Sequence, residues 1–355
     1  TTEIYTLSLH DALPISLIAR LARSAQDLGV QMLESTPAQR LIIENGSVCG
    51  AVVLHAGEEK TIRAKAVVLA AGGFPNDAQR RQAMFPRDAS GHDNLALPPL
   101  SCSGDGLRLG ESAGGRVADD LRSPVAWAPV SKVPYPDGSV GHFPHIIDRG
   151  KPGIIGVLQN GQRFVNEAGG YYDYVDAMLK AIPEDQEACS WLICDHRFQR
   201  RYGLGFARPA PLPVAPHIRN GYLKRGATLE ELAAACGIDP LGLTTTVSEF
   251  NRHARLGEDP QFGRGSTPFN RRSGDAQHTG PNPCVAPIEH GPFYAVKVQP
   301  GCFGTFAGLR TDGQARVLDA NAQPIPGLYA AGTDMASPLG GHYPSGGINL
   351  GPAMT

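Results

Sequence analysis

The sequence predicts an α/β fold in which a second, α+β domain is inserted. Two observations indicate the α/β part. Residues 66–71 are an uninterrupted apolar run followed by two glycines, and residues 327–332 read Gly-Leu-Tyr-Ala-Ala-Gly. Such runs are typical of parallel strands that are buried on both faces. A third observation indicates the insertion, because residues 129–292 are rich in proline and mix loop and helix signals. We therefore expect one α/β unit at the two ends of the chain and another domain between them.

The first residues are excluded from the expected fold. Residues 1–15 read TTEIYTLSLHDALPI, which resembles one reading frame of a sequencing-adapter oligonucleotide. The alternative is a short amphipathic arm, but the match runs through all fifteen residues. We treat residues 1–16 as an adapter-like artefact and expect the native sequence to begin near Ser16.

The next elements are a helix and a small antiparallel meander. Residues 17–28 carry apolar side chains at helical spacing, and Gly29 follows as a stop signal. Turn signals such as Asn45-Gly46 then separate several short β-rich runs. The expected strands of the meander are residues 30–33, 40–43, 48–55 and 61–63.

Later elements complete the outline. Residues 101–118 form a glycine-rich turn into a short helix, helix patterns cover 228–236 and 244–254, and a helix starts at Asn349. We place the first α/β part at 17–128, the inserted domain at 129–296 and the second α/β part at 297–355.

Composition excludes several function classes. Hydrophobic residues make up 41% and charged residues 19%, as in ordinary globular proteins, and the net charge of -2 argues against nucleic acid as a partner. No apolar run is long enough to be a transmembrane segment. The seven cysteines form no C-x-x-C pair and the histidines show no metal spacing, so no metal site is expected. An odd number of scattered cysteines favours reduced thiols and a cytoplasmic location.

An ordered set of sequence blocks resembles one flavoprotein superfamily. The blocks are AVVLAAGGF, SGDGLRLGESAGG, NGQRFVNEA, FNRHARLGEDPQFGRG, GPFYAVKV and GLYAAGTD followed by GGHYPSGGINLGPAMT. Together they resemble fumarate reductase flavoproteins, aspartate oxidases and, most closely, 3-ketosteroid dehydrogenases. The resemblance implies FAD as cofactor, a Rossmann-type FAD-binding domain and an inserted capping domain that closes over the flavin. No G-x-G-x-x-G follows a strand, so we expect an incomplete FAD-binding domain without its front end.

The resemblance also implies which residues hold the cofactor. The glycines after the first apolar run would let the backbone approach the flavin, and Asp334 would accept a ribityl hydroxyl. The glycine-rich loop near the end would place a helix N-terminus against the flavin pyrimidine, where free N–H groups stabilise negative charge. The expected cofactor residues are Ala71, Gly72, Gly73, Asp105, Gly106, Gly332, Thr333, Asp334, Gly346, Gly347, Ile348, Asn349 and Leu350.

Departures from the fumarate reductase pattern argue against a dicarboxylate substrate. Tyr171 stands where the resemblance implies a catalytic arginine, and Pro344 where it implies a clamping arginine. The block at 300–308, where a substrate-binding histidine is implied, contains none. Two carboxylates without these partners would be buried unpaired, which costs several kcal/mol.

The replacements resemble the 3-ketosteroid dehydrogenase arrangement. It implies that the Tyr343 hydroxyl and the Gly347 amide polarise a substrate ketone, and that Tyr171 removes the acidified proton beside it. Ser345 would add another donor to the ketone oxygen. A free tyrosine has a pKa of about 10, so a base at Tyr171 needs help, for which Tyr172, Tyr174 or a residue of the expected missing front end are candidates. The expected substrate is a small apolar ketone, steroid-like or another cyclic ketone; the electron partner is not identified.

Three alternatives stay open at this stage. Tyr171 is also explained as a packing residue of a tyrosine-rich patch. A reductase of a small unsaturated acid is the second, and Arg149, Lys151 or Arg163 would then have to enter the site. The third is a chain that binds no FAD and is not an enzyme. The scattered residues His142, His145 and His342 are expected to be structural or exposed.

Overall fold

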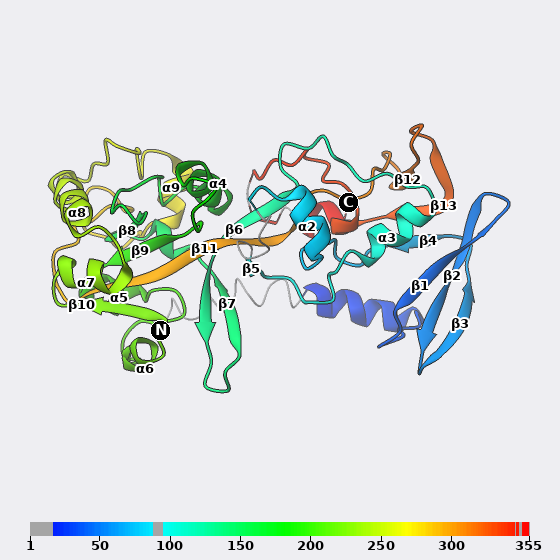
Figure 1. The fold of residues 1–355 in the computed structure, drawn as a ribbon, viewed down its shortest axis with the longest axis horizontal. Helices are drawn as coiled ribbons and strands as arrows, with labels where there is room; N and C mark the ends of the chain where they lie inside the picture. Colours follow the sequence, from blue (N-terminus) through cyan, green and yellow to red (C-terminus); the bar gives the residue numbers. More distant parts are fainter. Residues whose placement is uncertain (1–16, 88–94, 345, 348–349, 355) are drawn as a thin grey trace.

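A computed structural model describes residues 17–87, 95–344, 346–347 and 350–354. The described chain forms an elongated molecule with two lobes (Figure 1). Two long antiparallel strands, β6 (Val125–Pro134) and β11 (Phe293–Thr305), run from one lobe into the other. They contain the expected domain limits at 128/129 and 296/297, and both strands continue through these positions. The division into domains stays a prediction.

The larger sheet organises the lobe that holds the inserted segment. Its strand order is β7-β6-β11-β9-β8, and β10 and β5 both pair with β11. All pairs are antiparallel except the short parallel pair of β11 with β5. The remaining strands are β5 (Leu95–Ala96), β7 (Val140–Pro144), β8 (Ile154–Val157), β9 (Ser190–Cys194) and β10 (Leu223–Gly226).

The other lobe contains two three-stranded sheets. The meander β1 (Ala38–Glu44), β2 (Ser47–His55) and β3 (Glu58–Arg63) is antiparallel, as predicted. Its first turn has φ of 51° at Asn45 and 76° at Gly46, the left-handed pair that a two-residue hairpin requires. Residues 30–33 were expected to be a further strand, and this is wrong: they are irregular, because no neighbouring strand pairs with them.

The third sheet contains both predicted apolar strands. In it β4 (Val67–Leu69) pairs parallel with β13 (Pro324–Ala330), and β12 (Arg316–Leu318) lies on the other side of β13. Leu69 is buried, but the Val68 side chain is 60% exposed. The prediction that this strand is buried on both faces is therefore wrong at Val68, since one face of β4 is open in the described part of the chain.

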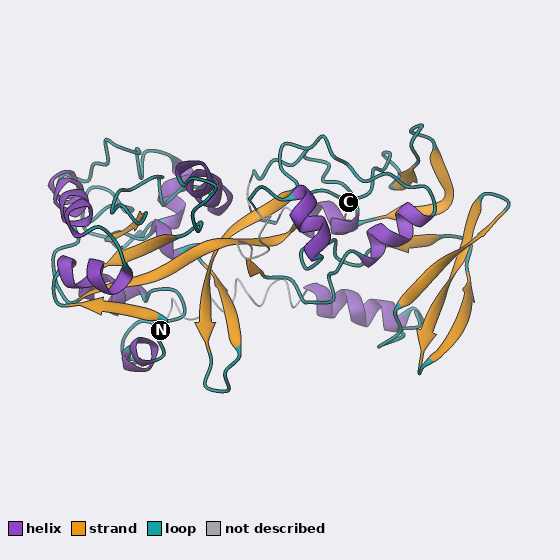
Figure 2. Ribbon diagram, in the orientation of Figure 1, coloured by secondary structure: helices purple, strands orange, loops and turns teal. Residues whose placement is uncertain are grey.

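Helices cover both lobes (Figure 2). The predicted helix at 228–236 is confirmed as α7 (Leu229–Cys236), which is capped by the Thr228 hydroxyl. The helix expected at 244–254 begins earlier, as α8 (Pro240–Ala254), because Asp239 caps it and Pro240 fits its first turn. The remaining helices are residues 17–27, α2 (Ala78–Met84), α3 (Asp105–Ser112), η1 (Asp148–Gly150), α4 (Tyr171–Ala181), α5 (His196–Tyr202), α6 (Ala215–Arg219), α9 (Pro268–Ser273), η2 (Gly332–Asp334) and α10 (Leu350–Met354).

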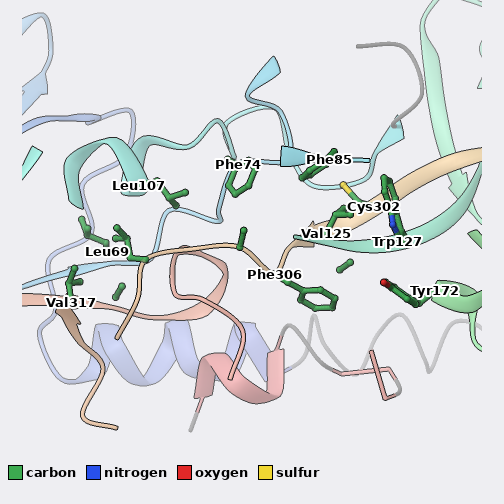
Figure 3. Close-up of a cluster of buried hydrophobic side chains, with 14 of the residues drawn as sticks. Leu69, Phe74, Phe85, Leu107, Val125, Trp127, Tyr172, Cys302, Phe306 and Val317 are labelled. Atoms are coloured by element: carbon green, nitrogen blue, oxygen red, sulfur yellow. The ribbon is translucent and has the colours of Figure 1, made fainter. Parts of the chain in front are cut away.

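One hydrophobic cluster joins the two lobes (Figure 3). It contains Leu69, Phe74 and Leu107 from the lobe with the two three-stranded sheets, and it reaches Trp127 on β6 and Tyr172 on α4. Because a single core continues from the two three-stranded sheets to α4, the residues at the start of α4 are held against the lobe that contains those sheets. None of the described helices is long and apolar enough to cross a membrane.

Candidate active site

Tyr171 and Tyr343 meet where the two lobes join. Tyr171 is the first residue of α4, and Tyr343 lies in the loop that follows η2. Their hydroxyl groups are hydrogen-bonded, and their rings pack edge to face with centroids 5.0 Å apart. The structure thus brings together two predicted catalytic residues that are far apart in the chain.

Other aromatic rings surround this pair. Tyr172 stacks on Tyr343 with ring centroids 5.7 Å apart, and Phe306 packs against Tyr343 at the same centroid distance. Phe303 meets Tyr171 edge to face at 5.4 Å. The sequence did not predict a role for either phenylalanine, although both lie in the 300–308 block, where the family pattern implies a histidine. Together these rings form an aromatic cluster around the two hydroxyls.

The environment distinguishes the two hydroxyls. Burial raises the pKa of Tyr171 above its ordinary value, while the hydrogen bond between the two hydroxyls and the positive charge of Arg149 oppose this shift. Burial also raises the pKa of Tyr343, and there the Tyr171 hydroxyl raises it further. Burial therefore raises the pKa of both tyrosines above its ordinary value. Tyr174 has a different role from the one expected, because it is fully buried and hydrogen-bonded to Ser190 at 3.0 Å.

Asp334 joins several of the predicted cofactor residues. Its buried carboxylate accepts hydrogen bonds from the backbone N–H of Ala71 at 2.5 Å and of Gly73 at 2.9 Å. A Cβ on Gly106 would lie 2.0 Å from a carboxylate oxygen of Asp334. Burial raises the pKa of Asp334, and the two backbone hydrogen bonds oppose that shift. Asp334 therefore fixes the start of α3 and the end of β4 against η2.

The glycines after β4 are required by the packing of the chain itself. Gly73 has φ of 71°, and a Cβ there would lie 2.3 Å from the Thr305 hydroxyl oxygen. A Cβ on Gly72 would lie 2.6 Å from the sulfur of Cys102. Asp105 does not join the Asp334 cluster, because its partly exposed carboxylate pairs with Arg108.

The glycine-rich loop leaves open space beside the tyrosine pair. Gly347 has φ of 92°, and a Cβ there would meet nothing within 4 Å. A Cβ on Gly346 would meet only the Tyr171 hydroxyl, at 3.8 Å. Leu350 begins α10, which packs against η2 and so lies close to Gly332 and Thr333. The predicted residues Ser345, Ile348 and Asn349 lie outside the described residues.

The cations that a small-acid reductase would need have other partners. Arg149 is buried and donates to the carbonyls of His145 and Glu167 at 2.8 and 2.9 Å. Lys151 donates to the Gly274 carbonyl at 2.8 Å. Arg163 is buried and pairs with the carboxylates of Glu167 and Asp259, the latter at 2.8 Å.

The histidines also have protein partners. His145 is fully buried between Asp148, at 2.6 Å, and the Ser131 hydroxyl, at 3.0 Å. His142 contacts the carbonyl of Ala96 at 2.9 Å. Within the described ranges, no three His, Cys, Asp or Glu side chains gather closely enough to hold a metal ion.

The profile of one protein family, described as FAD binding domain, matches residues 14–350. The chain belongs to this family. A 4-oxocyclohex-2-ene-1-carboxylate 5-dehydrogenase of Sinomonas cyclohexanicum is 42% identical over 343 residues, which cover 96% of this chain and 57% of that protein. Two solved structures extend the family relation to fold.

A 3-ketosteroid delta1-dehydrogenase from Sterolibacterium denitrificans has a TM-score of 0.86 and 36% identity, covering 94% of this chain and 60% of that one. A flavocytochrome c3 fumarate reductase in an open conformation has a TM-score of 0.64 and 26% identity, covering 95% of this chain and 52% of that one. The α/β FAD-binding fold and the closeness to the ketosteroid dehydrogenase branch are thereby confirmed. The chain spans about three fifths of the length of the Sinomonas and Sterolibacterium relatives and about half of that of the flavocytochrome.

The described residues fit FAD, the cofactor of this family. Gly346 and Gly347 are exposed and carry no side chains, and a Cβ on Gly346 would lie 3.8 Å from the Tyr171 hydroxyl, so the backbone beside Tyr171 is open to close approach. Asp334 orders the backbone around this region through Ala71 and Gly73. Backbone that carries no side chains and is held in a fixed position is what the close approach of a flat ring requires.

Proposed function

We propose that this chain carries the catalytic part of an FAD-dependent dehydrogenase that acts on a CH–CH bond next to a ketone. The observation that carries the proposal is the hydrogen-bonded pair Tyr171 and Tyr343 inside an aromatic lining. Dehydrogenation beside a ketone needs one hydroxyl that donates a hydrogen bond to the ketone oxygen and another group that accepts the proton of the adjacent carbon. It does not need the cationic side chains that bind a dicarboxylate.

Tyr343 and Gly347 polarise the ketone in this proposal. The Tyr343 hydroxyl and the Gly347 N–H donate to the ketone oxygen and stabilise the negative charge that develops there. Tyr343 has a single proton to donate, so its hydroxyl turns from Tyr171 to the ketone when the substrate binds. Its raised pKa suits this role, because the hydroxyl keeps its proton. Ser345 is proposed as a further donor.

Tyr171 acts as the base. It takes the proton from the carbon next to the polarised ketone, and the electron pair of that C–H bond contributes to the new double bond. Burial raises the pKa of Tyr171, and the loss of the Tyr343 hydrogen bond raises it further, so the positive charge of Arg149 is the group that favours the ionised base. FAD, when bound, accepts the hydride that leaves the neighbouring carbon. One proton and one hydride thus leave the substrate, which is oxidised by two electrons.

The residues proposed to hold the cofactor are Ala71, Gly72, Gly73, Gly106, Gly332, Thr333, Asp334, Gly346, Gly347, Ile348, Asn349 and Leu350. For Asp105 the surface pairing with Arg108 supports no such role. The names of the Sinomonas and Sterolibacterium relatives support a cyclic ketone as substrate, because each name denotes a compound with a ketone on a six-membered ring.

The first test concerns Tyr343. The purified chain is saturated with FAD and assayed with cyclic ketones and an artificial electron acceptor. Loss of one oxyanion-hole donor costs roughly 100- to 1,000-fold in turnover, so Tyr343→Phe is expected to lose at least about 100-fold. The matched control is Tyr135→Phe in the β6–β7 hairpin, where the side chain is 41% exposed. Full activity of Tyr343→Phe would remove the proposed role.

The second test concerns the cofactor. The visible absorbance spectrum of the purified chain, after incubation with FAD and removal of free FAD, is expected to show flavin bands. A spectrum without flavin bands would support the alternative that the chain binds no FAD and is inactive.

A further inference from the structure

An exposed arginine lies beside the loop that carries Tyr343. The backbone N–H of Arg122 donates to the Gly340 carbonyl at 3.0 Å, which ties residue 122 to this loop. A guanidinium nitrogen of Arg122 lies 3.5 Å from Nδ1 of His342. Because His342 directly precedes Tyr343, the guanidinium stands at the rim of the aromatic site.

The charge of Arg122 acts on the same aromatic cluster. It lowers the pKa of Tyr172, against the larger effect of burial, and Tyr172 is the ring that stacks on Tyr343. It also lowers the pKa of the half-buried Asp173 carboxyl, which burial and Asp176 raise. The guanidinium is therefore close to Tyr172 and Asp173 at the start of α4.

Arg122 differs from the other cation near the tyrosines. The N–H groups of Arg149 are used by backbone carbonyls, and its guanidinium lies over the Tyr174 ring, 5.0 Å from the centroid. Arg122 is exposed, and no carboxylate among the described residues lies within ion-pair distance of it. Of these two cations, Arg122 is the one whose side-chain N–H groups are available to a ligand.

We propose that Arg122, assisted by His342, binds a carboxylate of the substrate on the side of the ring that lies away from the ketone. This rests on the proposed function, in which Tyr343 and Gly347 hold the ketone oxygen. The substrate class is then a single-ring ketone that carries a carboxylate, with its ring against the Tyr172 and Tyr343 faces. An arginine fork matches a carboxylate in a bidentate arrangement, which a point charge does not.

The experiment measures binding and turnover separately. The chain is saturated with FAD and titrated calorimetrically with 4-oxocyclohexanecarboxylate and with 4-methylcyclohexanone, which has the ketone and ring but no charge. The variants are Arg122→Gln, Arg122→Lys and the control Arg252→Gln, an exposed arginine in the last turn of α8. Far-ultraviolet circular dichroism checks that each variant is folded.

The expected result is a loss specific to the charged ligand. Arg122→Gln is expected to weaken binding of the carboxylate about tenfold, the factor that corresponds to a charge-assisted pair worth about 1.4 kcal/mol. Binding of the uncharged ketone is expected to stay unchanged. Arg122→Lys restores part of the loss, and Arg252→Gln changes neither affinity.

Equal carboxylate affinity of wild type and Arg122→Gln overturns the inference, as does a wild type that does not bind the carboxylate or binds both ligands equally. Failure of the proposed function has a different signature. The carboxylate would bind in an Arg122-dependent manner, but neither ketone would be dehydrogenated when an electron acceptor is added.

Discussion

Asp334 and the tyrosine pair show two kinds of functional residue at the scale of the single side chain. In the proposed function Tyr171 and Tyr343 contact the substrate, and burial raises the pKa of both hydroxyls. Asp334 works through the backbone, since both carboxylate oxygens accept N–H groups of the segment after β4. One carboxylate thereby orders a loop that the sequence marked only by its glycines.

Asp334→Asn is predicted to destabilise the fold. The amide offers one acceptor oxygen, so its NH₂ group would face one of the two backbone donors at Ala71 and Gly73. A buried donor without a partner costs about 1–3 kcal/mol. The loss is measured as the free energy of unfolding in urea.

Asp105→Asn is the matched control, because the Asp105 carboxylate is partly exposed and pairs with Arg108 of the same helix. It is expected to change stability by less than about 0.5 kcal/mol. Equal losses for the two variants would contradict the structural role given to Asp334.

At the scale of elements, neighbours in space override local propensity. The Asn45-Gly46 hairpin follows its sequence signal, since the left-handed turn is encoded by the two residues themselves. Helix α8 contains Gly242 at its third position, although glycine is a poor helix former. A Cβ on Gly242 would lie 2.1 Å from the carbonyl oxygen of Asn160, so the close approach of a loop requires the glycine.

Gly242→Ala is predicted to destabilise the protein, against the usual trend. In an exposed helix the change would stabilise by about 1 kcal/mol. Here the added Cβ overlaps the Asn160 carbonyl and forces backbone to move, which costs typically about 1–3 kcal/mol. Thermal unfolding followed by circular dichroism provides the measurement.

Ser248→Ala tests propensity alone on the same helix, because Ser248 is exposed. It is expected to raise stability by a few tenths of a kcal/mol. If Gly242→Ala also raised stability, the close approach at Asn160 would be wrong.

At the scale of the whole molecule, buried charges and continuous strands hold distant segments together. Glu167 is fully buried and accepts from Arg163 at 2.7 Å, from Arg264 at 3.2 Å and from the Gly156 N–H at 3.0 Å. Arg163 also pairs with Asp259 at 2.8 Å. This network links the residues before α4 to the loop after α8. Because Glu167 lies shortly before Tyr171 in the chain, the network holds the segment that leads into α4.

The network predicts a loss of stability in acid. Burial opposes ionisation of Glu167, but the charges of Arg163 and Arg264 outweigh burial and lower its pKa. A carboxyl with a lowered folded pKa contributes stability above its ordinary pKa of about 4, and this contribution is lost as the pH falls through the folded value. The melting temperature is expected to decline below about pH 4.

Glu167→Gln separates this network from general acid effects. The variant removes the carboxylate charge that Arg163 and Arg264 share, which costs about 3–5 kcal/mol at neutral pH, and its melting temperature should fall less steeply in acid than that of wild type. Glu58→Gln, at an exposed position of β3, is the control. Parallel melting curves for wild type and Glu167→Gln across the pH range would refute the assignment.

The sequence by itself determined the elements whose signals are local. The meander turns, the capped helix α7 and the two apolar strands were predicted because turn residues, caps and apolar runs act over a few positions. The family resemblance, carried by ordered motifs, identified FAD and the tyrosines. Only the tertiary structure decided what depends on distant partners. It exposed Val68, left residues 30–33 without a strand, directed Asp105 to the surface and brought Phe303, Phe306 and Arg122 to the tyrosine pair. Such placements depend on contacts between residues far apart in the chain, which no local pattern encodes.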